Sequence, residues 1–276
     1  MTAPASLTAP VGAQIRHWRA RRRLSQLELA LEADVSTRHL SCVETGRAAP
    51  SREMVLRLAN RLDVPLRERN RLLTAAGFAP MYPARPLADP ALAAARQVVE
   101  LVLRGHEPCP ALAVDRHWNV VMQNRAVPLL VDGVAPDLLA GPVNALRLSL
   151  HPRGMAPRIV NLAAWRAHVL ARLRQQIVAS DDDTLRALED ELAAYPAPDD
   201  AAHAPTPAGG EPALVVPLVV DSPLGRLSFI STTTVFGTPV DVTLAELALE
   251  SFFPADAATT AALRAAFATL PDTDAG

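Results

Sequence analysis

The chain has 276 residues, half of them apolar, which is enough for two ordinary domains with a sizeable core and excludes global disorder. The net charge of −2 hides an asymmetry, because residues 11–77 carry 13 Arg against 7 acidic residues whereas the rest of the chain carries 14 Arg against 22. A basic part joined to an acidic part indicates that only the first meets a polyanion.

Nothing in the sequence indicates export or insertion into a membrane. Residues 1–10 lack a basic segment followed by an apolar core, and we expect them to form a flexible tail. No uncharged apolar run approaches the roughly 18–20 residues that a membrane helix needs. Cys42 and Cys109 form neither a metal-ligand spacing nor a disulfide framework. These features predict a cytoplasmic protein without a membrane partner.

Five short helices are predicted within residues 11–78, the first over 11–23. Ser25 is followed three residues later by Glu28, which is the pattern of a capping box at the start of the second helix. Ser36 and Ser51 are suitable caps for the next two helices. A fifth helix opens at Pro65 and closes at Gly77. Residues 11–78 are therefore expected to form an all-α domain.

The prolines of residues 79–90 predict a stiff linker, after which residues 91–270 form a second domain and residues 271–276 a tail. Residues 196–212, with five prolines and two glycines, are interpreted as a mobile loop. A fifth strand is expected at 146–149 or elsewhere. The elements predicted for this domain are helices over 91–104, 163–177, 185–195, 243–252 and 257–270, and strand pairs over 111–115 with 118–123 and 214–220 with 227–235.

Residues 25–47 have the layout of a helix-turn-helix, in which the second helix enters the DNA major groove. Ala30 stands where only a small residue lets two helices cross closely. Asp34 stands in the turn, where a left-handed conformation is needed that Gly would suit better. The positions expected to be buried are Leu29, Val35, Leu40 and Val43.

With these residues the segment resembles the xenobiotic-response-element family of regulators, which are built like lambda-type phage repressors. The resemblance implies that Gln26 bonds a phosphate or an adenine edge, and that Ser36, Thr37, Arg38 and Cys42 face the bases. Arg38 is the strongest candidate, because a guanidinium can bond guanine O6 and N7 together, worth about 1–3 kcal/mol of discrimination. The positions that match phosphate contacts are Arg19, Arg47 and Arg52.

Three segments of the second domain resemble the PAS-like ligand-binding domain of MmyB-like regulators. They are ALAVDRHWNVVMQNRAV at 111–127, HPRG at 151–154, and LSFISTTTVFGTPVDVTLAELALESFFPAD at 227–256. The resemblance implies an α/β fold of antiparallel strands backed by helices, with a small, lipophilic, fatty-acid-like molecule held between them.

Alternating apolar residues on the predicted strands could line such a pocket, or they could simply form the core. Arg125, Arg158 or Arg166 could anchor an effector carboxylate. The pocket candidates are Leu112, Val114, Trp118, Val120, Met122, Leu227 and Phe229.

Taken together, the sequence predicts a bacterial transcription regulator that binds double-stranded operator DNA as a homodimer and senses a small effector. No catalytic motif, metal-ligand pattern or resident cofactor is evident, so an enzyme is not expected. Two alternatives stay open. The N-terminal bundle could bind a protein partner, which would make the chain an adaptor, or the chain could be a lipid-binding protein that does not read DNA.

Overall fold

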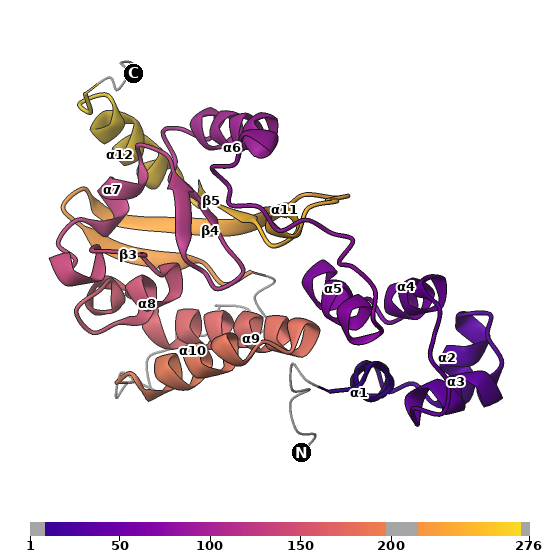
Figure 1. Ribbon diagram of the computed structural model, residues 1–276. Coiled ribbons are helices and arrows are strands. Elements are labelled where there is room, and N and C mark those ends of the chain that lie inside the picture. The colour runs from indigo at the N-terminus through magenta and orange to yellow at the C-terminus, as the bar shows by residue number, and fades with distance from the viewer. Residues whose placement is uncertain (1–8, 197–214, 272–276) are drawn as a thin grey trace. The chain divides into compact units, whose positions relative to one another are not determined.

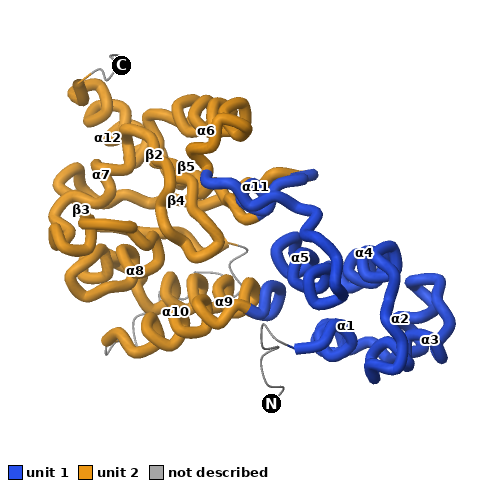
Figure 2. Tube along the Cα trace, viewed as in Figure 1, with its two compact units in different colours: residues 1–86, 178–181, 238–245 blue, residues 87–177, 182–237, 246–276 orange. Residues whose placement is uncertain are grey.

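The computed structural model describes residues 9–196 and 215–271. The chain divides into two compact units (Figure 2). Unit 1 comprises Met1–Pro86 with the short segments Val178–Asp181 and Thr238–Ala245. Unit 2 comprises Leu87–Ile177, Asp182–Gly237 and Glu246–Gly276. The predicted loop at 196–212 lies outside the described residues except for Pro196.

Unit 1 contains the five predicted helices (Figure 1). The capping box of Ser25 and Glu28 is present, and the hydroxyls of Ser36 and Ser51 accept from the backbone N–H groups of His39 and Met54. These caps satisfy amides that the first helical turn leaves unbonded. The helices are α1 (Val11–Arg21), α2 (Gln26–Glu32), α3 (Thr37–Glu44), α4 (Arg52–Arg61) and α5 (Leu66–Ala75).

The turn between α2 and α3 has the predicted backbone conformation, because Asp34 has φ = 52°. Arg23, with φ = 57°, makes α1 end two residues earlier than predicted. The core of unit 1 contains Leu29, Leu40 and Val43, each at most 1% exposed, so the two helices of the motif are fixed by burial on one side.

The side chain of Asn70 in α5 binds the start of the proline-rich segment that follows the helix. Asn70 Nδ2 donates to the Tyr82 carbonyl at 2.6 Å, and Asn70 Oδ1 accepts from the backbone N–H groups of Met81 and Tyr82. The start of the predicted linker is therefore pinned by hydrogen bonds.

Unit 2 is built on one five-stranded antiparallel sheet in the order β2-β1-β5-β4-β3. This confirms the expected α/β architecture with strands backed by helices. The central strand is β5, which pairs with β1 on one side and β4 on the other. The strands are β1 (Ala111–Val114), β2 (Val120–Gln123), β3 (Leu218–Ser222), β4 (Gly225–Val235) and β5 (Ala248–Pro254).

One prediction for this unit was wrong, and the expected fifth strand lies elsewhere than at 146–149. Residues 243–252 were expected to be helical, but only the short α11 (Val242–Ala245) is, and β5 follows. A central strand is buried on both faces, so it lacks the alternation that marks a half-exposed strand. Residues 146–149, the suggested fifth strand, lie instead in the helix α8 (Ala145–Leu150).

Helices cover both faces of the sheet (Figure 1). On one face α6 (Ala93–Gly105) packs through Val99 and Leu103 against β1 and Leu249 of β5. On the other face lie α7 (Val127–Val131), α8 and the long α9 (Leu162–Ser180), which shares its buried stripe with α10 (Asp183–Ala194). The chain ends with α12 (Ala257–Phe267), which contacts β4 and β5. Three short 3₁₀ helices lie at Pro90–Leu92, Pro136–Leu138 and Ala156–Arg158.

Candidate nucleic-acid interface and ligand cavity

The solvent side of α3 carries the polar residues that the sequence proposed as base contacts. Ser36, Arg38 and His39 are exposed, while Thr37 and Cys42 are half-buried. The Ser36 hydroxyl accepts from the His39 N–H at 3.1 Å, which leaves its own O–H free to donate. The inner side of the same helix is closed by Leu40, Val43 and Glu44.

Glu44 is a buried carboxylate that ties three helices together. Arg19 of α1 donates to it from Nε and Nη2 at 2.7 and 2.8 Å, and Gln26 of α2 donates from Nε2 at 2.7 Å. Burial raises the pKa of Glu44, but the hydrogen bonds from Arg19 and Gln26 and the charges of Arg19 and Arg16 outweigh burial, so the pKa lies below its ordinary value. The pKa of Arg19 is raised by its bond to the carboxylate.

Arg19 thus has a structural role that was not predicted, and its predicted phosphate contact stays a prediction. Its side chain is 13% exposed, and its remaining nitrogen, Nη1, donates to the Leu24 carbonyl at 2.8 Å. Arg19 therefore holds α1 to α3. Gln26 lies at the first position of α2, where its amide orientation is set by Glu44, and its carbonyl oxygen stays available.

Three arginines near α3 are placed differently. Arg38, Arg47 and Arg52 are all exposed, and within residues 9–196 and 215–271 none of them makes an ion pair or a side-chain hydrogen bond. Their charges are therefore not neutralised inside the fold. They sit on α3, directly after α3 and at the start of α4, so one region of unit 1 combines exposed positive charge with the polar face of α3.

Unit 2 holds a cavity of about 330 Å³ between the sheet and helices α7, α8 and α9. All but four of the side chains that line it are apolar, and the exceptions are Gln123, Ser149, Arg172 and Glu250. Ser149 accepts from Trp165 Nε1 at 2.9 Å, which satisfies the indole N–H. The volume falls at the lower end of the range of small-molecule pockets.

Of the predicted pocket residues, Leu112, Trp118 and Val120 line this cavity. Val114, Leu227 and Phe229 lie in the same apolar core outside the lining, as the alternative interpretation proposed.

Met122 lies on the opposite face of the sheet, against the cluster under α6, because a register shift breaks the alternation in β2. Trp118 precedes β2, in the connecting turn, and not in the strand as predicted.

The cavity lining contains an ion pair that was not predicted from the sequence. Arg172 of α9 donates from Nη2 and Nη1 to Glu250 of β5 at 2.8 and 3.3 Å, and from Nη2 to the Thr233 hydroxyl at 2.7 Å. Thr233 in turn donates to Glu250 at 2.7 Å. The guanidinium carbon of Arg172 lies 5.0 Å from the Trp118 ring centroid. The side chains of Glu250 and Arg172 are 5% and 28% exposed.

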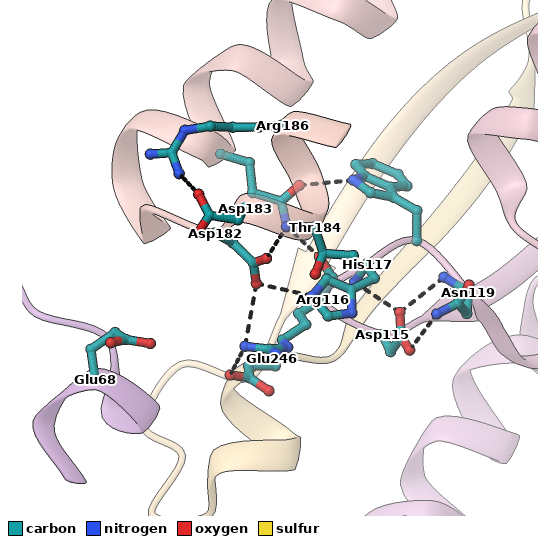
Figure 3. Close-up of polar contacts among 12 residues, drawn as sticks. Glu68, Asp115, Arg116, His117, Asn119, Asp182, Asp183, Thr184, Arg186 and Glu246 are labelled. Carbon is teal, nitrogen blue, oxygen red and sulfur yellow. Dashed lines mark hydrogen bonds and ion pairs between the residues drawn. The ribbon is translucent and has the colours of Figure 1, made fainter. Parts of the chain in front are cut away.

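A polar turn positions Trp118 for this contact. Asp115 accepts from the backbone N–H groups of His117 and Asn119 and from Asn119 Nδ2, all at 2.8–2.9 Å (Figure 3). Trp118 has φ = 70° within this turn, and its Nε1 donates to Gln176 at 2.8 Å.

The same turn is tied to the start of α10. Asp182, the N-cap of that helix, accepts from His117 Nε2 at 2.9 Å and pairs with Arg116 at 3.3 Å (Figure 3). Burial raises the pKa of Asp182, but the His117 bond and the charges of Arg116 and His117 together outweigh burial, so the pKa lies below its ordinary value.

The three arginines suggested from the sequence as carboxylate anchors are not among the residues that line the cavity. Arg125 pairs with Glu107, and Arg158 and Arg166 donate to the carbonyls of Leu130 and Ala193. In the described part of the chain no three His, Cys, Asp or Glu side chains gather as metal ligands, and no helix there has the length and apolarity to cross a membrane.

The fold, the exposed polar face of α3 and the cavity of unit 2 define a class of protein. In this class, a helix-turn-helix unit is joined to an α/β unit with a mostly apolar cavity. Residues 95–266 match the MmyB-like transcription regulator ligand binding domain, and residues 10–72 match a helix-turn-helix domain. The first match spans more than half of the chain, so the chain belongs to the MmyB-like transcription regulator family. It is a DNA-binding transcription regulator, and the resemblances drawn from the sequence are confirmed.

Among solved structures, the chain is similar to the clp gene regulator ClgR from Corynebacterium glutamicum, with 26% identity over 38% of this chain and 99% of that one. The TM-score of 0.22 is too low for this likeness to carry a structural argument. No curated protein matches the chain.

Proposed function

We propose that the protein binds a specific operator as a homodimer through α3, and that a small lipophilic, fatty-acid-like effector in the cavity of unit 2 changes this binding. The observation that carries the DNA-reading part is the exposed Arg38 on the solvent side of α3, without an intramolecular partner among the described residues. A guanidinium in that state is ready to bond a guanine edge.

The exposure of Arg47 and Arg52, and the lack of intramolecular partners for them among the described residues, support a second set of roles on unit 1. Arg47 and Arg52 supply charge for phosphates, which fixes register without reading sequence. Gln26, Ser36, Thr37 and Cys42 stay proposed contacts of the recognition surface.

A dimer is proposed because one such module reads too few base pairs for useful specificity. Native mass spectrometry of the freshly purified protein tests the dimer, and a monomer at DNA-binding concentrations would contradict it.

Binding to a selected operator and to random duplex tests the DNA-reading role. We expect Arg38→Ala to weaken operator binding by about 1–3 kcal/mol while binding to random duplex falls much less. Arg61→Ala removes an exposed charge from the end of α4 and serves as the matched control. Equal losses for the two variants would contradict the base-reading role. Absence of steep salt dependence for the wild type would favour the adaptor alternative.

The effector part is supported by the mostly apolar cavity of about 330 Å³. A cavity left empty loses the dispersion contacts of its lining, so an apolar ligand that fills it stabilises the fold. Ala145→Phe places a ring into the cavity from α8, whereas Ala167→Phe adds the same ring at an exposed position of α9.

We expect the first variant alone to lose any small molecule that copurifies with the wild type and to lose the effector's influence on operator affinity. A ligand that binds without changing operator affinity would favour the lipid-binding alternative.

A further inference from the structure

Helix α6 carries large apolar side chains on two sides. Val99 and Leu103 are buried against the sheet, 1% and 2% exposed, whereas Val98, Leu101 and Val102 are 50%, 67% and 43% exposed. Figure 1 shows α6 at the outside of unit 2. Single exposed apolar residues are ordinary, but three of them within five positions of one helix form a patch. A helix that is apolar on both sides is typical of one that is covered on both sides.

We propose that the outer side of α6 binds the same surface of a second copy of the chain, with the two helices antiparallel about a two-fold axis. The inference rests on the homodimer of the proposed function and adds the surface that forms it. The centre of this surface, the outer stripe of α6, consists of Ala94, Val98, Leu101 and Gly105.

The outer stripe has the spacing of a seam between two helices. Its residues are four, three and four positions apart, which is the alternation that keeps side chains on one line toward a partner helix. This order reads the same in both directions. In an antiparallel pair, Val98 therefore lies opposite Leu101 of the other copy, and Ala94 opposite Gly105. Small residues at both ends let the helices approach closely.

The charges of α6 favour a second copy over an oppositely charged partner. Arg96, Glu100 and Arg104 follow one another at intervals of four along a flank of the helix, outside the outer stripe. Glu100 lies 3.7 Å from Arg96 and 3.8 Å from Arg104, so these residues pair within the helix. A two-fold contact brings the same surface against itself, and an uncharged stripe avoids the repulsion that like charges would cause there.

The apolar surface continues past the end of α6 onto the sheet. His106, which follows the helix, packs edge-on against Phe253 with ring centroids 4.6 Å apart. Phe253 is 46% exposed, and Ile230, its neighbour on β4, is 38% exposed. Phe253 lies four residues after Leu249 on β5, so both point to the face that α6 covers. A specific interface buries about 800 Å² per partner, and these side chains extend the stripe toward that area.

Sedimentation velocity of the full-length protein without DNA, over a range of concentrations, tests this surface. Leu101→Glu places a charge in the middle of the outer stripe, and Glu suits a helix about as well as Leu does. The two-fold dimer loses a covered Leu twice, so we expect its dissociation constant to rise at least about 100-fold. Leu224→Glu is the matched control in the turn between β3 and β4, where Leu224 is 37% exposed, and should change the constant less than about twofold.

A second variant tests the antiparallel pairing. Val98→Lys alone should weaken the dimer as Leu101→Glu does, because its ammonium group loses water in the contact. With both substitutions in one chain, opposite charges face each other twice across the two-fold axis, so the double variant should bind at least about tenfold more tightly than either single variant. Absence of this recovery would overturn the antiparallel arrangement. Circular dichroism verifies that each variant is folded, and Val98→Lys by itself decides the question if Leu101→Glu does not fold.

The outcomes separate this inference from the proposed function. A wild-type dimer that Leu101→Glu leaves intact would overturn the α6 surface and leave the homodimer standing, and the same result is expected if another part of the chain or another protein covers α6. A wild-type monomer at DNA-binding concentrations would overturn the homodimer, and the α6 surface with it.

Discussion

Glu44→Gln offers the sharpest test of how unit 1 is held together. Removing one partner of a buried ion pair costs about 3–5 kcal/mol when the remaining charge is fully buried. Arg19 is 13% exposed and the oxygen of the introduced amide still accepts one hydrogen bond, so we expect a smaller loss of about 2 kcal/mol. Because 1.4 kcal/mol corresponds to a factor of about ten, amides in α1–α3 should exchange with solvent about 30-fold faster.

Hydrogen exchange followed by mass spectrometry on the full chain measures this loss for each unit separately. Glu53→Gln is the matched control, since it breaks an exposed pair with Arg57 in the same unit and should cost less than about 0.5 kcal/mol. Peptides from β1 and β5 of unit 2 should not change in either variant. If Glu44→Gln accelerated exchange no more than Glu53→Gln, the carboxylate would not be the tie between the three helices.

Three further outcomes follow from particular contacts. Asp34→Gly should slow exchange in α2 and α3 by up to about fivefold, because glycine adopts the left-handed conformation of this turn without steric cost, and faster exchange would count against that. Asn70→Ala should speed exchange of the Met81 and Tyr82 amides selectively; unchanged rates would mean that Asn70 does not hold the segment. The pKa of Glu44 is lowered in the folded protein, so the stability that its carboxylate contributes is fully present above the ordinary pKa of 4.5 and is lost as the pH falls through the lower pKa of the folded state. On acidification, the protection of α1–α3 from exchange should therefore drop more in the wild type than in Glu44→Gln. Parallel pH dependences of protection in the two proteins would refute this linkage.

The helix-turn-helix could be predicted almost residue by residue because its signals are local. A serine cap, an acidic residue three positions later and a left-handed turn residue all act within one helical turn. Ser25, Ser36 and Ser51 cap their helices as predicted. The structural role of Arg19 could not be predicted, since its partner Glu44 lies 25 residues away and looks like any other acidic residue on a helix.

Unit 2 was harder to predict because its decisive contacts are distant in sequence. The strand β5 begins with Ala248, Leu249 and Glu250, which also suit helices, and pairing with its two neighbouring strands makes it extended. The register shift that moves Met122 to the other face has no mark in the sequence. Arg172 and Glu250 meet across 78 residues, so neither stood out among the other charged residues.

Several elements of unit 2 hold the Arg172 guanidinium in the cavity lining. Arg172 is held by Glu250, by the Thr233 hydroxyl and by the ring of Trp118, and Trp118 is itself held by Gln176 and by the turn around Asp115. The Arg172 side chain cannot turn its guanidinium toward a new anion without breaking its contacts to β4, to β5 and to the turn that holds Trp118. A ligand that binds without moving Arg172 avoids the cost of this rearrangement, because preorganised donors lower the cost of binding only for a group that they already fit. Any ligand of this cavity would therefore meet a guanidinium whose orientation is already set by the fold.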